Sequence, residues 1–221
     1  MPYNVYLFNG LGISNPMNRT VLSAANLTSI QTVLKGYFDQ VVQAHDRLGR
    51  RGQTNYGTSN VQWVQPPLPS IAAHELLVYL IPAGTTVVTN GKLEQGKPPS
   101  GHDGLTHSIA NAPGVSGSTT GSEVFPNFAL TPQGLTVVAG LMFHETMHNK
   151  LALGNAQLHS QGGLAIGVPQ GAITDTTPLT PNNINVMAAG LDVARPQWTA
   201  GLSVLVSAAN VPDSDPSKGI F

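Results

Sequence analysis

Apolar residues recur at intervals of three and four over residues 27–46. They are Ile30, Val33, Leu34, Tyr37, Phe38, Val41 and Val42. This spacing places them on one face of a helix, so the sequence predicts a long amphipathic helix here. Asn26 or Thr28 can cap its start, and Gly49 can end it.

Shorter runs predict strands on both sides of this helix. Residues 3–8 are aromatic and β-branched, and Asn9-Gly10 ends them. Residues 60–65 alternate between apolar and polar positions. Residues 75–81 form a nearly continuous apolar run, which suits a strand buried on both faces at the centre of a sheet.

The middle of the chain has little periodicity. Residues 83–121 are rich in Gly, Ser, Thr, Asn and Pro, which predicts a long irregular stretch. Residues 122–129 then favour a short strand. Pro126 interrupts it and lacks an N–H donor, so we expect this strand at the edge of the sheet.

Helix-start patterns mark the second half of the chain. Thr131-Pro132 places a capping threonine before a proline at the first helical position, and the helix would run to a turn at Gly154-Asn155. Thr180-Pro181 repeats the pattern. Pro196 opens a last amphipathic segment, before a polar tail over residues 212–221.

The first of these helices carries the pattern H-E-x-x-H. His144 and His148 are four residues apart, so one helical face presents both imidazoles to a single metal ion. Glu145 follows the first histidine directly and would lie beside the metal, where it can polarise a bound water. The pattern predicts a catalytic zinc site. A helix that carries these three side chains by chance is the alternative.

Composition narrows the classes of function. The 221 residues carry a formal net charge of −1 and only 10% charged residues, so no basic field exists for nucleic acid. There is no cysteine, so any metal is held by His, Asp or Glu. The N-terminus lacks signal-peptide features, and no apolar run reaches the roughly 18 residues of a membrane span. We expect a soluble protein, which works where it is made, is a mature form, or is secreted by another route.

A catalytic zinc site needs a third protein ligand. No glutamate follows Glu145, so a later glutamate ligand is excluded. The downstream candidates are His159, Asp175, Asp192, Asp213 and Asp215. His159 is preferred, because the turn before it lets the chain reverse and Gly162-Gly163 allows a tight loop. Asp175 is its main rival, and Asp192 suits a helix cap or an outer-shell partner of a histidine.

Other histidines have simpler interpretations. His102, Asp103 and His107 form a weaker group, suited to a polar loop more than to a second metal site. His45 is expected to be a cation at a helix end, and His74 a surface residue before a strand.

With these residues, the chain resembles the zincin metallopeptidases, and within them a divergent metzincin. That resemblance implies one α+β domain over residues 1–221: a small mixed sheet, a long N-terminal helix and the motif helix. Residues 1–153 would form an N-terminal lobe, and residues 154–221 an irregular C-terminal lobe ending in a helix. An extended peptide would add to the edge strand over residues 122–129.

The family pattern H-E-x-x-H-x-x-G-x-x-H is matched in part. His144, Glu145 and His148 agree in type and spacing, whereas Gly154 and His159 come later than the pattern places them. The motif helix would therefore run about one turn longer. Met187 is a candidate for the family's methionine turn under the metal, although Thr180-Pro181 equally predicts a helix with Met187 in its core.

The resulting hypothesis is a zinc-dependent endopeptidase acting on a protein or peptide, with Glu145 as general base and His144, His148 and His159 on Zn²⁺. Two other functions remain open. One is a non-catalytic zincin-like domain that binds peptide, against which an intact Glu145 argues. The other is a zinc amidase that hydrolyses a non-peptide or cell-wall amide. The sequence does not indicate an oligomeric state.

Overall fold

A five-stranded sheet with the order β2-β1-β3-β7-β6 lies at the centre of the structure. Its strands are β1 (Tyr3–Asn9), β2 (Ser59–Val64), β3 (Leu76–Leu80), β6 (Gly104–Ile109) and β7 (Thr119–Val124). The first four in spatial order run parallel, and β6 pairs antiparallel with β7. The mixed sheet and the central position of β3 confirm the predictions. β4 (Thr86–Val88) and β5 (Lys92–Glu94) form a separate antiparallel pair.

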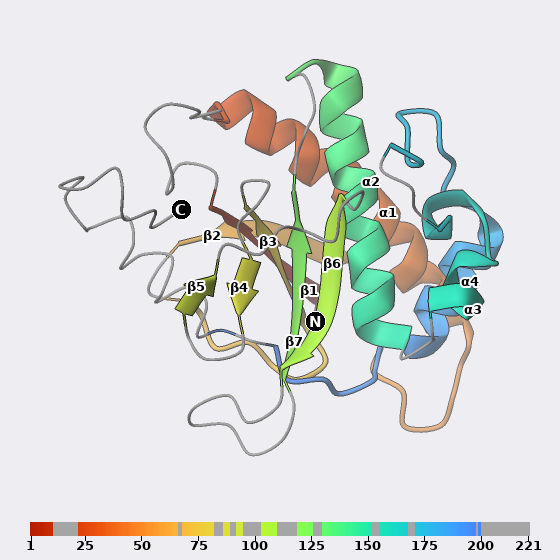
Figure 1. Cartoon of the computed structure of the whole chain (residues 1–221). Helices are drawn as coiled ribbons and strands as arrows, with labels where there is room; N and C mark the ends of the chain where they lie inside the picture. Colours follow the sequence, from red (N-terminus) through yellow and green to blue (C-terminus); the bar gives the residue numbers. More distant parts are fainter. Residues whose placement is uncertain are drawn as a thin grey trace, which may run out of the picture.

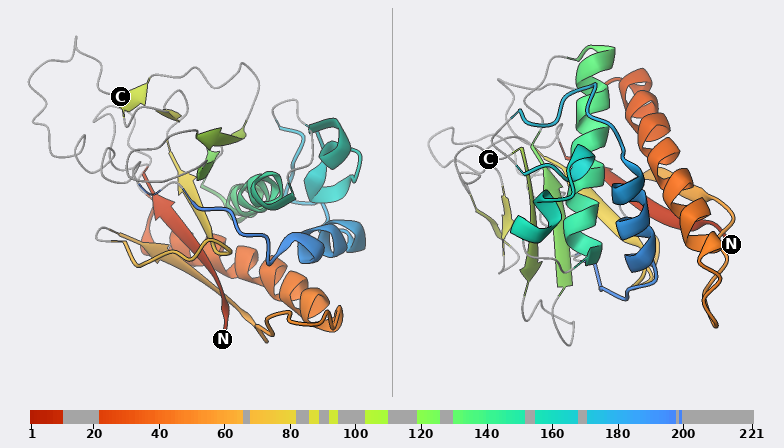
Figure 2. Two further views of the ribbon diagram at one scale, coloured as in Figure 1. Left: turned by 90° about the horizontal axis from the view of Figure 1, so that it is seen from below. Right: turned by 90° about the vertical axis from the view of Figure 1, so that its right-hand side faces the viewer.

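The helices gather on one side of this sheet (Figures 1 and 2). They are α1 (Ala24–Arg47), α2 (Pro132–Leu151), α3 (Asn155–His159), the 3-10 turn η1 (Gly163–Ala165) and α4 (Pro181–Gly190). This is a computed structural model. It describes residues 1–10, 22–65, 68–81, 86–88, 92–94, 103–109, 119–125, 130–151, 155–167, 171–197 and 199. Within these ranges, no helix has both the length and the apolar character needed to cross a membrane.

Helix α1 forms where the apolar spacing predicted it. Its buried face consists of Ile30, Leu34, Phe38, Val41, Val42 and His45. It begins earlier than predicted because Ser23 and Asn26 form a reciprocal capping box. Gly49 follows its end with a φ of +58°, a conformation that glycine adopts without strain.

Helix α2 is buried on nearly every side, because it lies between the sheet, α1 and α4. Thr131 caps it as predicted: its Oγ1 accepts a hydrogen bond from the Gly134 N–H at 3.2 Å. Phe143 packs edge-on against Tyr37 and Phe38 of α1. A helix buried all round has little freedom to rotate or slide, so the side chains after Phe143 are held in fixed directions.

The predicted edge strand is wrong in position. β7 covers residues 119–124 and lies between β3 and β6, so it is an interior strand. Pro126 and the rest of the predicted strand lie outside the described residues. The edge on this side is β6, inside the stretch that was expected to be irregular. Its sequence, GLTHSI, lacks the apolar content that would have revealed it.

Two C-terminal predictions also need correction. Met187 is fully buried inside α4, so it belongs to a helix and not to a turn. The capping box of Thr180 and Asn183 explains why this segment forms a helix and not a turn. The last predicted helix does not start at Pro196, since Gln197 instead bridges to Thr120 of β7. Apart from residue 199, which is not helical, the remainder of that predicted helix lies outside the described residues.

Candidate metal centre

Side chains at successive positions of α2 contact different parts of the protein. Phe143 and Met147 belong to the apolar core. The next pair, His144 and His148, brings its two imidazoles together, with Nε2 atoms 3.1 Å apart. Because residues four apart share a helical face, each pair has one common direction. The H-E-x-x-H spacing therefore gives two histidines on one face, as predicted.

A third histidine completes the group. His159, the last residue of α3, places its Nε2 3.2 Å from the Nε2 of His148. Its ring stacks on that of His144, with the centroids 5.4 Å apart. The ligand atoms of the three residues all lie within 4.8 Å of one another. These three histidines are close enough to bind one metal ion.

Two of the nitrogen separations are close to those around a tetrahedral ion. Three nitrogens at about 2.0–2.1 Å from a tetrahedral zinc lie about 3.3–3.4 Å from each other. The two Nε2–Nε2 distances of 3.1 and 3.2 Å are close to this value. Three histidines without a thiolate also match the ligand sets of catalytic zinc.

The protonation of the histidines favours metal binding. His144 Nδ1 lies 2.7 Å from the carbonyl oxygen of Leu164, to which it donates, so its Nε2 carries the lone pair. Burial lowers the pKa of His144 to about 4, and the charge of His159 adds to this effect. Burial, with the charges of His144 and His159, lowers the pKa of His148 to about 3. Both rings are therefore neutral at physiological pH, which is the form that binds metal.

Glu145 is buried against the sheet. Its Oε2 accepts a hydrogen bond of 2.7 Å from the hydroxyl of Thr106 on β6. Burial raises the pKa of Glu145 to about 8; the charge of Glu123 raises it too, whereas the bond from Thr106 lowers it. A Cβ added to Gly104 would lie 2.8 Å from the Cδ of Glu145, so only glycine leaves room for this carboxyl group.

A buried polar layer continues behind Glu145. Asn149, one turn later on α2, donates to the hydroxyl of Ser122 at 3.0 Å and to Oε1 of Gln197 at 2.9 Å. Gln197 donates back to Asn149 Oδ1 at 3.2 Å. The Ser122 hydroxyl in turn lies 3.2 Å from that of Thr106. These bonds fix the rotation of α2 against the strands, since buried polar groups need their partners.

Other glycines and backbone groups support the site and were not predicted. A Cβ on Gly167 would lie 2.8 Å from His159 Nδ1, so this glycine lets the backbone pass close to the third ring. Leu164 contributes only its carbonyl oxygen to His144. Neither residue type signals such a role in a sequence, because the role depends on which segments the fold brings together.

The remaining sequence candidates lie elsewhere. Asp175 is exposed in a turn and does not join the three histidines. Asp103 is buried, and its Oδ2 accepts a hydrogen bond from the Gly171 N–H at 2.8 Å. His102 and the side chain of His107 lie outside the described residues. Gly154, expected at the turn after α2, does so too.

No known protein family, curated protein or solved structure matches this chain.

Proposed function

We propose that this protein is a zinc-dependent endopeptidase. The observation that carries the proposal is the convergence of three histidine Nε2 atoms next in sequence to a buried Glu145. Three imidazole nitrogens that face one another, with no thiolate beside them, are an arrangement that can hold a catalytic zinc ion. His144, His148 and His159 would hold the ion.

A bound zinc ion supplies a Lewis acid that polarises a carbonyl group and acidifies water. Glu145 supplies the proton transfer. Its carboxyl group, with a pKa near 8, holds and releases a proton close to neutral pH, as a general base and acid must. Thr106 keeps Oε2 in place, and Oε1 lies against Gly104 of the same strand.

The edge strand β6 supports a peptide as substrate. Among the described strands, β6 pairs with β7 alone, and a substrate strand would add to its other edge. Thr106 lies on β6 and bonds to Glu145, so a peptide extended along this edge would run close to the carboxyl group. β6 takes over the role that the sequence had suggested for residues 122–129.

The decisive experiment replaces Glu145 with glutamine. Glu145→Gln should retain zinc at wild-type stoichiometry and lose about 10²–10⁴-fold in the rate of hydrolysis of an unfolded protein, the range for general acid–base catalysis. Glu94→Gln, on the separate β4–β5 sheet, is the control and should keep full activity. Chelator should abolish the wild-type activity.

Each competing function gives a different result. Full peptidase activity in Glu145→Gln would refute the role of this residue. Zinc binding without hydrolysis of any peptide would favour a binding domain, or an amidase if a non-peptide amide is cleaved. Absence of stoichiometric zinc in the wild type would refute the metal centre.

A further inference from the structure

Asn183 is fully buried near the start of α4. Its Oδ1 accepts hydrogen bonds from the N–H of Leu164 at 3.0 Å and from that of Thr180 at 3.2 Å. Its Nδ2 donates to the carbonyl oxygen of Gly162 at 2.9 Å. One amide group thereby ties the start of α4 to the turn over residues 162–164.

That turn is the one that supports His144. The carbonyl oxygen of Leu164 accepts the Nδ1–H of His144 at 2.7 Å. The Leu164 N–H is shared between Asn183 and the Pro178 carbonyl oxygen at 3.1 Å. Gly163 has a φ of +57°, and a Cβ there would lie 2.6 Å from Asn183 Oδ1, so the turn is shaped to admit this amide.

Helix capping alone does not account for Asn183. Helix α1 has the same capping box, with Asn26 in the equivalent position after Ser23. Among the described residues, the hydrogen bonds of the Asn26 side chain stay within that box. Asn183 caps its helix in the same way and also binds two backbone groups of a distant turn. Capping therefore does not explain the two additional hydrogen bonds of Asn183.

We propose that Asn183 is a positioning residue of the metal centre. It fixes the turn that carries the Leu164 carbonyl, and this carbonyl fixes the tautomer and orientation of His144. His144 then presents its Nε2 lone pair to the ion in one direction. The Leu164 carbonyl is the outer-shell partner of His144, and loss of such a partner typically lowers metal affinity by about 10–100-fold. The inference requires only that the three histidines bind zinc, whether or not the protein cleaves peptides.

The test measures zinc affinity by competition with a chromophoric chelator, beside the free energy of unfolding of the metal-free protein. Asn183→Ala should lower zinc affinity toward the upper end of that about 10–100-fold range. Asn26→Ala removes the same capping interaction and should leave zinc affinity unchanged, although it also lowers stability. The ¹⁵N shifts of His144 should show a mixture of tautomers in Asn183→Ala only.

A second variant keeps the proposal testable if Asn183→Ala does not fold. Asn183→Asp retains the acceptor for Leu164 and loses the donor to Gly162, so it should lower zinc affinity by about tenfold, the lower end of the range. Wild-type zinc affinity in either Asn183 variant would refute the proposal. Equal losses in the Asn183 and Asn26 variants would refute it too. A wild type that binds zinc without peptidase activity would count against the proposed function only.

Discussion

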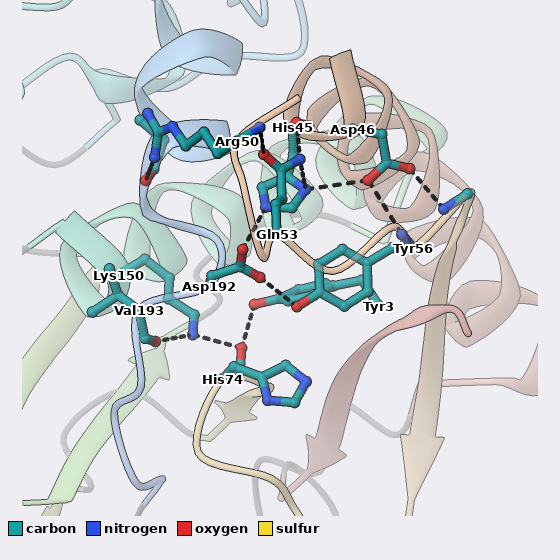
Figure 3. Close-up of polar contacts among 12 residues, drawn as sticks. Tyr3, His45, Asp46, Arg50, Gln53, Tyr56, His74, Lys150, Asp192 and Val193 are labelled. Atoms are coloured by element: carbon teal, nitrogen blue, oxygen red, sulfur yellow. Dashed lines mark hydrogen bonds and ion pairs between the residues drawn. The ribbon is translucent and has the colours of Figure 1, made fainter. Parts of the chain in front are cut away.

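The three histidines of the candidate metal centre and the network around His45 both bury imidazole rings, but their nitrogens face different groups. In the metal centre, Nε2 atoms of His144, His148 and His159 face one another. In the His45 network, Nε2 of His45 lies 3.0 Å from Oδ2 of Asp192, and its Nδ1 lies 3.2 Å from Oδ1 of Asp46 (Figure 3).

The His45 network is complete without a ligand. The other oxygen of Asp192 accepts a hydrogen bond of 2.7 Å from the Tyr56 hydroxyl, and Asp46 accepts from the backbone N–H groups of Tyr56 and Gly57. Each donor meets an acceptor, so burial is compensated within the protein. In the metal centre the Nε2 atoms face one another, and a bound cation would supply the compensation.

Helix α2 takes part in both regions. Lys150, two residues after His148, is buried and donates to the carbonyl oxygens of His74 at 2.6 Å and Val193 at 2.9 Å (Figure 3). The Tyr3 hydroxyl donates to the same oxygen of His74 at 2.8 Å. The end of the motif helix is therefore anchored by a polar network that stabilises the fold, while the turn before it carries His144 and His148. The two regions should respond to mutation in opposite ways.

The largest expected effect comes from removing a ligand. His159→Ala should lower zinc affinity by more than about 1000-fold, an order beyond the roughly 10–100-fold of an outer-shell partner. The metal-free variant should unfold at a free energy equal to or above that of the wild type, because the close approach of three imidazole rings is relieved. Metal competition and urea unfolding of the metal-free protein measure the two quantities.

His45→Gln is the matched change in the other region. It should lower the free energy of unfolding and leave zinc affinity unaltered, since its partners are carboxylates and not the ion. If His159→Ala destabilised the metal-free protein as His45→Gln does, the contrast between the two regions would be wrong. If His159→Ala also left zinc affinity unchanged, His159 would not be the third ligand.

The sequence predicted the features of the fold and of the candidate site that depend on local spacing. His144, Glu145 and His148 follow from one helical turn, and the buried face of α1 follows from its apolar periodicity. His45 was predicted to be a cation at a helix end. It lies in the last turn of α1 but is buried, three and four residues after the buried Val42 and Val41. Residues three and four apart share a helical face, so the spacing that predicted the buried face of α1 also predicts that His45 is buried.

Other features depend on tertiary contacts that no local pattern encodes. The order of strands in the sheet put β6 at the edge although its sequence is polar, and it put β7 inside. Gly104 and Gly167 matter because of the side chains opposite them, Glu145 and His159. His159 was predicted to reach the site from a loop, whereas it lies at the end of α3. Ligand chemistry predicted His159 itself but not its position at the end of a helix.

Acidification gives the next effect. The pKa of His144 falls from 6.5 in the unfolded chain to about 4 in the folded protein. Between these values the unfolded state binds the additional proton, so the free energy of unfolding decreases as pH falls. The difference corresponds to about 3 kcal/mol for the metal-free protein at about 1.4 kcal/mol per pKa unit. His148, whose pKa is also lowered, acts in the same direction.

A comparison of variants isolates this effect. The raised pKa of Glu145 acts in the opposite direction, because the stability it contributes at low pH is lost as pH rises toward 8. The measure is therefore the difference in urea unfolding between pH 7 and 4.5 for wild type and for His144→Gln. The variant should lose less stability on acidification. Parallel pH dependences would show that His144 is not held neutral by burial.

The smallest effect is expected from Asp192→Asn, which changes one oxygen of the His45 network to an amide nitrogen. Asp192 accepts from Tyr56 and pairs with His45 through separate oxygens, so asparagine can satisfy only one of them. Its side chain is 44% exposed, and water can replace part of the lost bond. We expect a loss of about 1 kcal/mol in the free energy of unfolding, the typical net value of one hydrogen bond.

Asp175→Asn, in an exposed turn, is the charge-matched control and should change nothing. Zinc affinity should stay at the wild-type value in both variants. A fall in zinc affinity in Asp192→Asn alone would mean that strain passes from residue 192 through Val193 and Lys150 to His148, and the two regions would then have to be treated as one coupled unit.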